Sequence, residues 1–305
     1  MTFGLEVAAT DYHTAGEPFR IVTEGGPALE GSTVRERREA AFASEEAERV
    51  RRLLCHEPRG HADMYGCFLV PPDDDGADLG VLFWHKDGYS TACGHGTIAL
   101  GAWAVESGRV EARADGEVDV TIDVPSGRVV ARVRMRGGAV ESVVFVNVPS
   151  YVVSRGDVEV AYGGALYASA PASAFGLRVV PDDLTALIAA GRQVKAELGD
   201  PELYGTILWE ELGALHQRNV TIFADGEVDR SPCGSGTSAR CALLGLRDGE
   251  VLRHDSIVGT TFHARVVGQT DEGVLTEVEG TAYRTGEHRF VLDPRDELGT
   301  GFVLR

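Results

Sequence analysis

The chain has 305 residues, of which 43% are apolar, and a formal net charge of −18 at pH 7. This length and apolar share predict a folded protein with two domains of roughly 150 residues each. The acidic excess argues against binding to nucleic-acid phosphates or to anionic lipid surfaces. A small anionic ligand is still compatible with this charge, because backbone dipoles can dominate the field close to a site.

The elements predicted in chain order combine helices with many short strands. The first part favours an exposed amphipathic helix over 34–54, a buried strand over 80–84 and a helix over 97–105 that ends at Gly108. Period-two patterning then predicts strands over 117–124, 129–135 and 143–148, followed by an amphipathic helix over 181–198. The last part predicts a strand over 219–223, a helix over 237–246, and strands over 262–267, 274–278 and 288–292.

Lysine and cysteine usage limits the chemistry and the compartment. The two lysines, Lys86 and Lys195, lie in no notable motif, which weakens a Schiff-base reading such as pyridoxal phosphate chemistry. Five cysteines are an odd number and do not suggest a disulfide framework. Residues 1–10 show no signal-peptide pattern, and no apolar run reaches about 18 residues, so we expect a cytoplasmic protein with reduced thiols.

A short motif occurs twice, which suggests two duplicated halves. Ala92 to Thr97 and Pro232 to Thr237 both contain Cys-Gly-x-Gly-Thr, and each precedes a helical stretch that ends at a glycine, expected at Gly108 and Gly249. We expect the first half to span 1–124 together with about 287–305, and the second half to span 125–286, with a boundary near Pro125.

A Cys-Gly-x-Gly loop at the start of a helix is suited to acid–base chemistry. It leaves backbone N–H groups unpaired, at a helix end that carries roughly half a positive charge. Such a site binds an anion such as a carboxylate, and it is expected to lower the pKa of its cysteine. If two such loops face each other, Cys93 and Cys233 could remove a proton from one face of an α-carbon and deliver one to the other.

Other interpretations of these residues have less support. Cys93 and His95 could be a pair of metal ligands, but the second loop has Ser235 in place of histidine and no further ligand cluster follows, so no metal is expected. A phosphate-binding loop would need the lysine that ends a Walker motif. The remaining cysteines lack the glycine setting and are predicted to be core residues, namely Cys55, Cys67 and Cys241.

Several further segments give the chain a resemblance to the proline racemase family. Both cysteine loops match that family's catalytic loops, the second beginning at Asp229-Arg230-Ser231. Other segments also resemble family elements, namely Asp11 to Pro18, Glu57-Pro58-Arg59-Gly60-His61, Ser256 to Phe262 and Gly280 to Tyr283. The resemblance covers essentially the whole chain.

This resemblance implies a fold, a site and a mechanism. The fold would be α/β (α+β), with two pseudo-symmetric halves, each a curved, mostly antiparallel sheet around a central helix, as in diaminopimelate epimerase. The site would lie in the cleft between the halves and need no cofactor. The two cysteines would be the acid/base pair, Asp229 and His95 would contact the ring nitrogen, and the substrate carboxylate would sit on N–H groups of Gly94, His95, Gly234 and Ser235.

Within the family, the sequence favours one activity over the others. Gly96-Thr97 resembles hydroxyproline 2-epimerases rather than proline racemases, and Cys233 stands where trans-3-hydroxyproline dehydratases usually carry threonine. The first expectation is therefore conversion of trans-4-hydroxy-L-proline to cis-4-hydroxy-D-proline. Proline racemase, trans-3-hydroxy-L-proline dehydratase and a non-catalytic imino-acid-binding protein remain alternatives. Apart from this small-molecule substrate, no nucleic-acid or membrane partner is expected, and a homodimer is left open.

Overall fold

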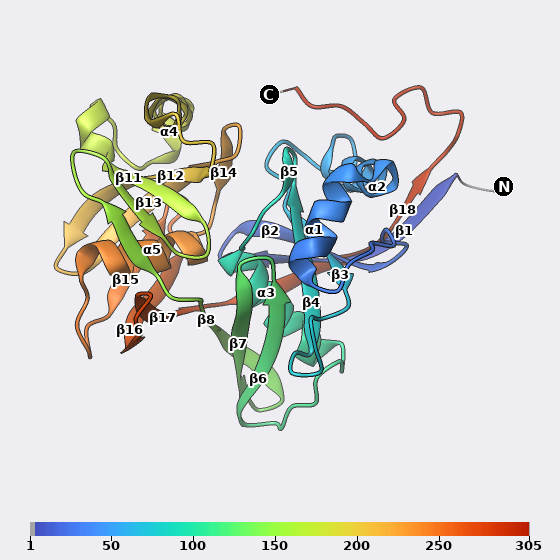
Figure 1. Cartoon of the computed structure of the whole chain (residues 1–305), viewed down its shortest axis with the longest axis horizontal. Coiled ribbons are helices and arrows are strands. Elements are labelled where there is room, and N and C mark those ends of the chain that lie inside the picture. Colours follow the sequence, from blue (N-terminus) through green and yellow to red (C-terminus); the bar gives the residue numbers. More distant parts are fainter. Residues whose placement is uncertain (1–3, 305) are drawn as a thin grey trace.

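The computed structural model describes residues 4–304, which form two lobes that lie side by side (Figure 1). The eighteen strands in this range belong to one hydrogen-bonded network, in which antiparallel pairs predominate. Each lobe wraps curved sheet around one buried helix. The α/β architecture predicted from the sequence is therefore confirmed.

The first lobe contains the N-terminal elements and the last strand. Its helices are α1 (Val34–Ala43), α2 (Glu45–Cys55) and the central α3 (Gly94–Glu106). Its strands are β1 (Leu5–Thr14), β2 (Glu17–Glu24), β3 (Gly66–Val70), β4 (Leu79–His85), β5 (Gly88–Tyr89), β6 (Gly116–Val124), β7 (Gly127–Arg136), β8 (Ala139–Val146) and β18 (Ala282–Leu292). Strand β18 returns from the second lobe and pairs antiparallel with β1 along its length (Figure 1).

The second lobe is built around α5 (Gly234–Leu244). Its other helical elements are α4 (Leu184–Leu198) and two short 3-10 turns, η1 (Ala172–Phe175) and η2 (Pro181–Asp183). Its strands are β9 (Tyr151–Ser154), β10 (Glu159–Tyr162), β11 (Leu166–Pro171), β12 (Leu203–Gly213), β13 (His216–Phe223), β14 (Glu227–Asp229), β15 (Leu252–Ser256), β16 (Thr261–Gln269) and β17 (Val274–Gly280).

The central helices are buried on all sides, which explains why they lack the charged face of a surface helix. Along α3 every residue from Gly94 to Ala104 is buried. Gly101 lets this helix approach β7 and β8 closely, since a Cβ there would lie 2.7 Å from the Ala131 Cβ and 3.0 Å from the Val143 Cγ1. Burial of this apolar helix fixes the position of its N-terminus, where the first cysteine motif lies.

Two helix boundaries differ from the sequence-based expectation. The helix expected over 34–54 is two helices, because the Ser44 N–H bonds to the Ala41 carbonyl and the Ser44 hydroxyl caps Ala47 at the start of α2. The helix after the second motif ends at Gly245 and not at Gly249. Gly245 has the left-handed conformation (φ 62°) that closes a helix, and Gly249 lies beyond it in a turn.

The boundary between the two lobes does not coincide with Pro125 in the sequence. Pro125 lies in the turn between β6 and β7, which pair antiparallel from Gly116↔Met135 to Val124↔Gly127. Strands β7 and β8 both pack on α3. We therefore propose that the boundary falls after β8 rather than near Pro125, and that the returning C-terminal segment begins with β18.

No helix within residues 4–304 is both long and apolar enough to cross a membrane. The three cysteines outside the two motifs are buried in the core, as the sequence predicted, namely Cys55, Cys67 and Cys241.

Candidate active site

The two Cys-Gly-x-Gly-Thr motifs stand at the N-termini of the two central helices. Cys93 is the N-cap of α3, with an extended backbone (φ −153°), and its Sγ accepts the Gly96 N–H at 3.2 Å. Cys233 occupies the same position before α5, but its backbone is left-handed (φ 65°). For a residue with a Cβ this conformation costs about 1–3 kcal/mol, so surrounding contacts must hold it.

The two helix ends touch. A Cβ on Gly94 would lie 2.5 Å from the Gly234 Cα, and a Cβ on Gly234 would lie 2.7 Å from the Gly94 Cα. Only glycine permits this approach at both positions. The free N–H groups of both first turns therefore converge on one place, where two positive helix ends together favour a bound anion.

A narrow cavity of about 10 Å³, with room for about one water molecule, adjoins this contact, and both lobes contribute to its wall. Six of the seven site residues expected from the sequence line it, and the seventh, Gly234, touches Gly94. The lining residues are Tyr65, Ala92, Cys93, Gly94, His95, Tyr167, Tyr204, Thr221, Phe223, Asp229, Cys233 and Ser235. The tertiary structure thus brings together residues from both halves of the chain.

Asp229 and His95 are adjacent on the wall of this cavity. The Asp229 Oδ1 accepts the Ser231 N–H at 2.8 Å and the Ser231 hydroxyl at 2.6 Å, and its Oδ2 lies 3.7 Å from the His95 Nδ1. Both ring nitrogens of His95 lie 3.5 Å from the Cys93 Sγ. A cationic group of a ligand would find a buried carboxylate here, where a charge-assisted hydrogen bond is strong.

Burial dominates the acidity of the two thiols. It raises the pKa of Cys93 well above its usual value, and it raises the pKa of Cys233 to about 12, with the Asp229 carboxylate adding to both shifts. The lowered thiol pKa expected from the helix ends is therefore wrong for this structure, although the Gly96 and Gly236 N–H groups do act in that direction. A cationic group of a ligand beside Asp229 would offset the effect of this carboxylate on the pKa values of the two thiols.

Tyrosines close the cavity, and sequence patterns gave no signal for them. The Tyr65 hydroxyl contacts the Ser90 Oγ and lies 2.9 Å from the Tyr204 hydroxyl, so this pair bridges the lobes. Tyr204 lines both the cavity and a wider cleft between the lobes. The Tyr167 hydroxyl lies 2.7 Å from the Ser235 Oγ. In the sequence these tyrosines cannot be told from ordinary core residues. They line the cavity only because segments far apart in the chain pack together.

The segment 225–230, which we call the β14 strap, connects the second lobe to the first. The Arg230 N–H donates to the Glu17 Oε2 at 2.7 Å, and the Arg230 Nη2 lies 2.7 Å from the Asp63 Oδ2. Glu17 is fully buried, and burial raises its pKa well above the usual value. Because Asp229 lies within the strap, these contacts fix its position relative to the first lobe.

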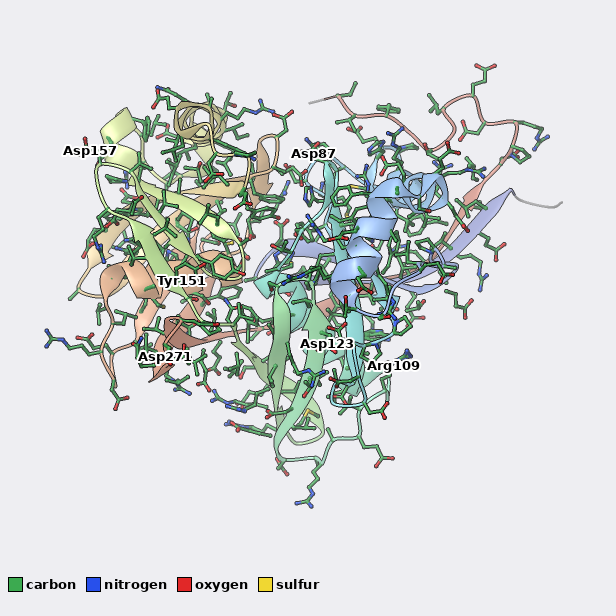
Figure 2. The ribbon with its side chains drawn as sticks, in the orientation of Figure 1. Asp87, Arg109, Asp123, Tyr151, Asp157 and Asp271 are labelled. Atoms are coloured by element: carbon green, nitrogen blue, oxygen red, sulfur yellow. The ribbon has the colours of Figure 1, made fainter. Side chains whose placement is uncertain are left out.

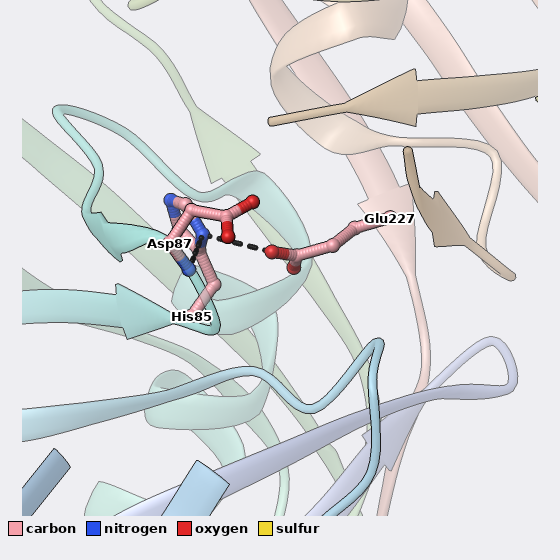
Figure 3. Close-up of side chains that lie close together, drawn as sticks. All are labelled: His85, Asp87 and Glu227. Carbon is pink, nitrogen blue, oxygen red and sulfur yellow. Dashed lines mark hydrogen bonds and ion pairs between the residues drawn. The ribbon is translucent and has the colours of Figure 1, made fainter. Parts of the chain in front are cut away.

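Glu227 of the same strap points to the turn between β4 and β5 (Figure 3). Its Oε1 lies 3.1 Å from the His85 Nδ1 and 3.9 Å from the Lys86 Nζ. Asp87, which lies where the two lobes face each other (Figure 2), accepts from the Lys86 Nζ at 2.9 Å. Burial raises the pKa of Glu227.

His85, Asp87 and Glu227 are close enough to share a metal ion. However, the Lys86 ammonium already lies beside both carboxylates, and the Asp87 N–H donates to the His85 Nδ1 at 3.2 Å. A metal ion would have to displace both contacts. We therefore describe this cluster as a polar contact between the lobes and assign no metal to it.

The chain is similar to known proteins over nearly its whole length. A family model described as proline racemase matches residues 9–303. The chain is 42% identical to a 3-hydroxyproline 2-epimerase of Burkholderia multivorans, over all of both chains. It is also 42% identical to a trans-3-hydroxy-L-proline dehydratase of Bacillus thuringiensis, over 96% of this chain and 97% of the relative.

A solved structure extends the likeness to three dimensions. The crystal structure of a hydroxyproline epimerase from Agrobacterium vitis, with bound trans-4-hydroxy-L-proline, superposes with a TM-score of 0.91 at 28% identity, covering 100% of this chain and 97% of the other. Fold, sequence and family model therefore agree over nearly the whole length. The chain belongs to the proline racemase family.

Proposed function

We propose that this isomerase inverts the α-carbon of a hydroxylated proline without a cofactor, using Cys93 and Cys233 as its two acid/base groups. One observation carries the proposal: both cysteines open into a single cavity at the point where two helix N-termini meet. An acid on one side of a substrate and a base on the other is what inversion at carbon requires.

The cavity offers complementary charge to both ends of an imino acid. The substrate carboxylate would accept hydrogen bonds from first-turn N–H groups of Gly94, His95, Gly234 and Ser235, where both helix dipoles favour negative charge. The ring ammonium would lie beside Asp229, with His95 next to it. This leaves the α-carbon between the two sulfurs.

The reaction would then proceed in two proton transfers. A thiolate on one side takes the α-proton, so the C–H bond breaks, an S–H bond forms, and the electron pair moves into the carboxylate as an enediolate. The opposite thiol then gives its proton to the other face of the carbon and becomes the thiolate. The converging N–H groups stabilise the charge that develops on the carboxylate oxygens.

The position of the ring hydroxyl is the finer question. The 3-hydroxyproline 2-epimerase at 42% identity favours ring carbon 3, whereas the epimerase that binds trans-4-hydroxy-L-proline is 28% identical. We therefore rank trans-3-hydroxy-L-proline first, as a substrate for epimerisation, and trans-4-hydroxy-L-proline second. Dehydration of the 3-hydroxy compound is the competing reaction, since several relatives at 40–42% identity are named for it. The cysteine at position 233 argues against dehydration.

The test is α-proton exchange in D2O, followed by NMR. Purified, reduced protein is incubated separately with trans-3-hydroxy-L-proline, trans-4-hydroxy-L-proline and L-proline. We expect loss of the α-proton signal together with growth of the C2 epimer, and the fastest substrate identifies the activity. The matched variants Cys93→Ser and Cys233→Ser should each lower the rate of inversion by about 10²–10⁴-fold.

Each other result has a definite meaning. An unsaturated product from the 3-hydroxy compound would establish dehydration and overturn the role given to Cys233. Absence of exchange with all three compounds would refute the substrate class and leave a binding protein as the alternative. Inversion that survives either serine substitution at the wild-type rate would refute the two-cysteine mechanism.

A further inference from the structure

A buried histidine lies behind the Cys233 loop and has no part in the steps above. His254 is on β15 and is completely inaccessible to solvent. The Asn219 Nδ2, from β13, lies 2.8 Å from its Nε2, and the Thr237 Oγ1, from α5, lies 2.8 Å from its Nδ1. The imidazole therefore connects the sheet of the second lobe to the first turn of its central helix.

Both partners of His254 also bind the carbonyl that precedes Cys233. The Pro232 oxygen accepts from the Asn219 Nδ2 at 3.0 Å and from the Thr237 Oγ1 at 3.1 Å. The Asn219 Oδ1 accepts a hydrogen bond from the Thr221 hydroxyl at 3.4 Å, and this contact fixes the orientation of the Asn219 amide. A flipped amide would instead place two oxygens against each other at Pro232.

These contacts determine the tautomer of the histidine. Asn219 donates one amide hydrogen to Pro232 and the other to the His254 Nε2, so this nitrogen accepts and Nδ1 carries the hydrogen. Nδ1–H then donates to the Thr237 oxygen, which leaves the Thr237 hydroxyl hydrogen for Pro232. A second proton on Nε2 would face a donor, and burial lowers the pKa of His254 to about 3.

The first lobe has a simpler arrangement at its matching loop. There a single side-chain donor, the Thr97 Oγ1, bonds to the Cys93 carbonyl at 2.8 Å, and the extended backbone of Cys93 is unstrained. Cys233 is the cysteine with left-handed backbone, and the carbonyl just before it receives two side-chain donors. The extra contacts thus occur at the strained position.

We propose that His254 is a positioning residue for Cys233. As the neutral Nδ1–H tautomer it orients Asn219 and Thr237, which hold the Pro232 carbonyl and keep the Cys233 sulfur in place against the α-carbon. His254 itself does not touch the substrate. The part of this inference that concerns reaction rate rests on the proposed two-cysteine function.

The test compares isotope effects in the two directions of the reaction. We expect His254→Phe to lower kcat/KM by about 10- to 100-fold, the cost of misplacing a reacting group by up to 1 Å. In the direction in which Cys233 takes the α-proton, the primary isotope effect of α-deuterated substrate should rise. In the reverse direction the primary isotope effect should fall towards unity, while the solvent isotope effect rises. A general loss of folded protein would change neither isotope effect.

Matched variants separate positioning from simple destabilisation. Thr237→Val should produce the same asymmetry as His254→Phe, whereas Thr97→Val, its counterpart in the first lobe, should produce the opposite one. His216→Gln removes a histidine from the neighbouring strand, where it contacts Asp255 at 2.8 Å. This variant should leave both isotope effects unchanged. If His254→Phe does not fold, His254→Gln, which keeps a polar group in the same space, is used in its place.

Alkylation of the thiols gives a readout that is independent of the activity. Iodoacetamide modification of each cysteine is followed by peptide mass spectrometry, and we expect the rate at Cys233 to change several-fold in the His254 variant while the rate at Cys93 does not. Unchanged rates at both cysteines, or symmetric isotope effects, would overturn the positioning role. A changed Cys233 rate in a protein that exchanges no hydroxyproline would leave the positioning role standing and refute the proposed function.

Discussion

Substitution of Gly94 by alanine tests whether contact between the two helix ends is necessary for catalysis. The added Cβ would lie 2.5 Å from the Gly234 Cα and 2.7 Å from the Ser235 nitrogen. Non-bonded carbons settle at about 3.5 Å or more, so the helix ends must separate by about 1 Å. Because both cysteines are attached to these ends, a separation of this size should lower kcat/KM by about 100-fold.

Gly101→Ala is the matched control, because it adds the same methyl group to the same helix. Its Cβ would lie 2.7 Å from the Ala131 Cβ, in the core and away from the site, where overpacking costs about 1–3 kcal/mol. We expect this variant to melt at a lower temperature and to keep the kcat/KM of the wild type. Thermal unfolding and initial rates are measured on both proteins.

Two results would contradict the reasoning. If Gly94→Ala folds and epimerises at the wild-type rate, the contact between the helix ends does not position the cysteines. If Gly101→Ala loses as much activity as Gly94→Ala, the loss reflects a distorted helix rather than a wider site.

The buried titratable groups should make both the reaction rate and the stability of the fold depend on pH. Because both thiol pKa values are raised, kcat/KM should increase between pH 7 and pH 9, and a plateau reached below pH 7 would contradict this. In the unfolded chain Cys233 ionises at its ordinary pKa of 9.0, whereas in the folded protein burial raises this pKa to about 12. The free energy of unfolding should therefore fall as pH rises from 9.0 towards 12. Urea titrations of Cys233→Ser should show a flatter dependence on pH. Burial lowers the pKa of His254 from 6.5 in the unfolded chain to about 3 in the folded protein. Its contribution to the free energy of unfolding is therefore complete above pH 6.5 and is lost as pH falls towards 3. His254→Phe should remove this part of the pH dependence. Glu227→Gln should leave the melting temperature at pH 8 unchanged or higher, because burial disfavours the charged carboxylate. A lower melting temperature would mean that the contacts of Glu227 with His85 and Lys86 stabilise the fold.

The sequence by itself predicted the main elements where their cause is local. Alternating apolar residues in β6 and β7 reflect one buried face, and this pattern exists before any strand pairs. The glycines of the two motifs are also local signals, because a Cys-Gly-x-Gly loop before an apolar helix exposes N–H groups in any fold. The exact ends of helices depend on more than local sequence. Ser44 can continue a helix or cap one, and the contacts of the neighbouring residues determine that it ends α1 and begins α2.

Other features depend on which segments meet. The sequence contains two cysteine motifs, but only the folded chain brings Gly94 against Gly234 and puts both sulfurs on one cavity. Thiol acidity is likewise a property of the assembled site, since burial raised both pKa values where helix ends alone would lower them. Residues far apart in the chain also meet in the tyrosine pair across the lobes, in the β14 strap, and in the contacts of His254 behind the Cys233 loop. Local patterns carry no record of such long-range contacts, which form only when distant strands and helices of the folded chain pack together.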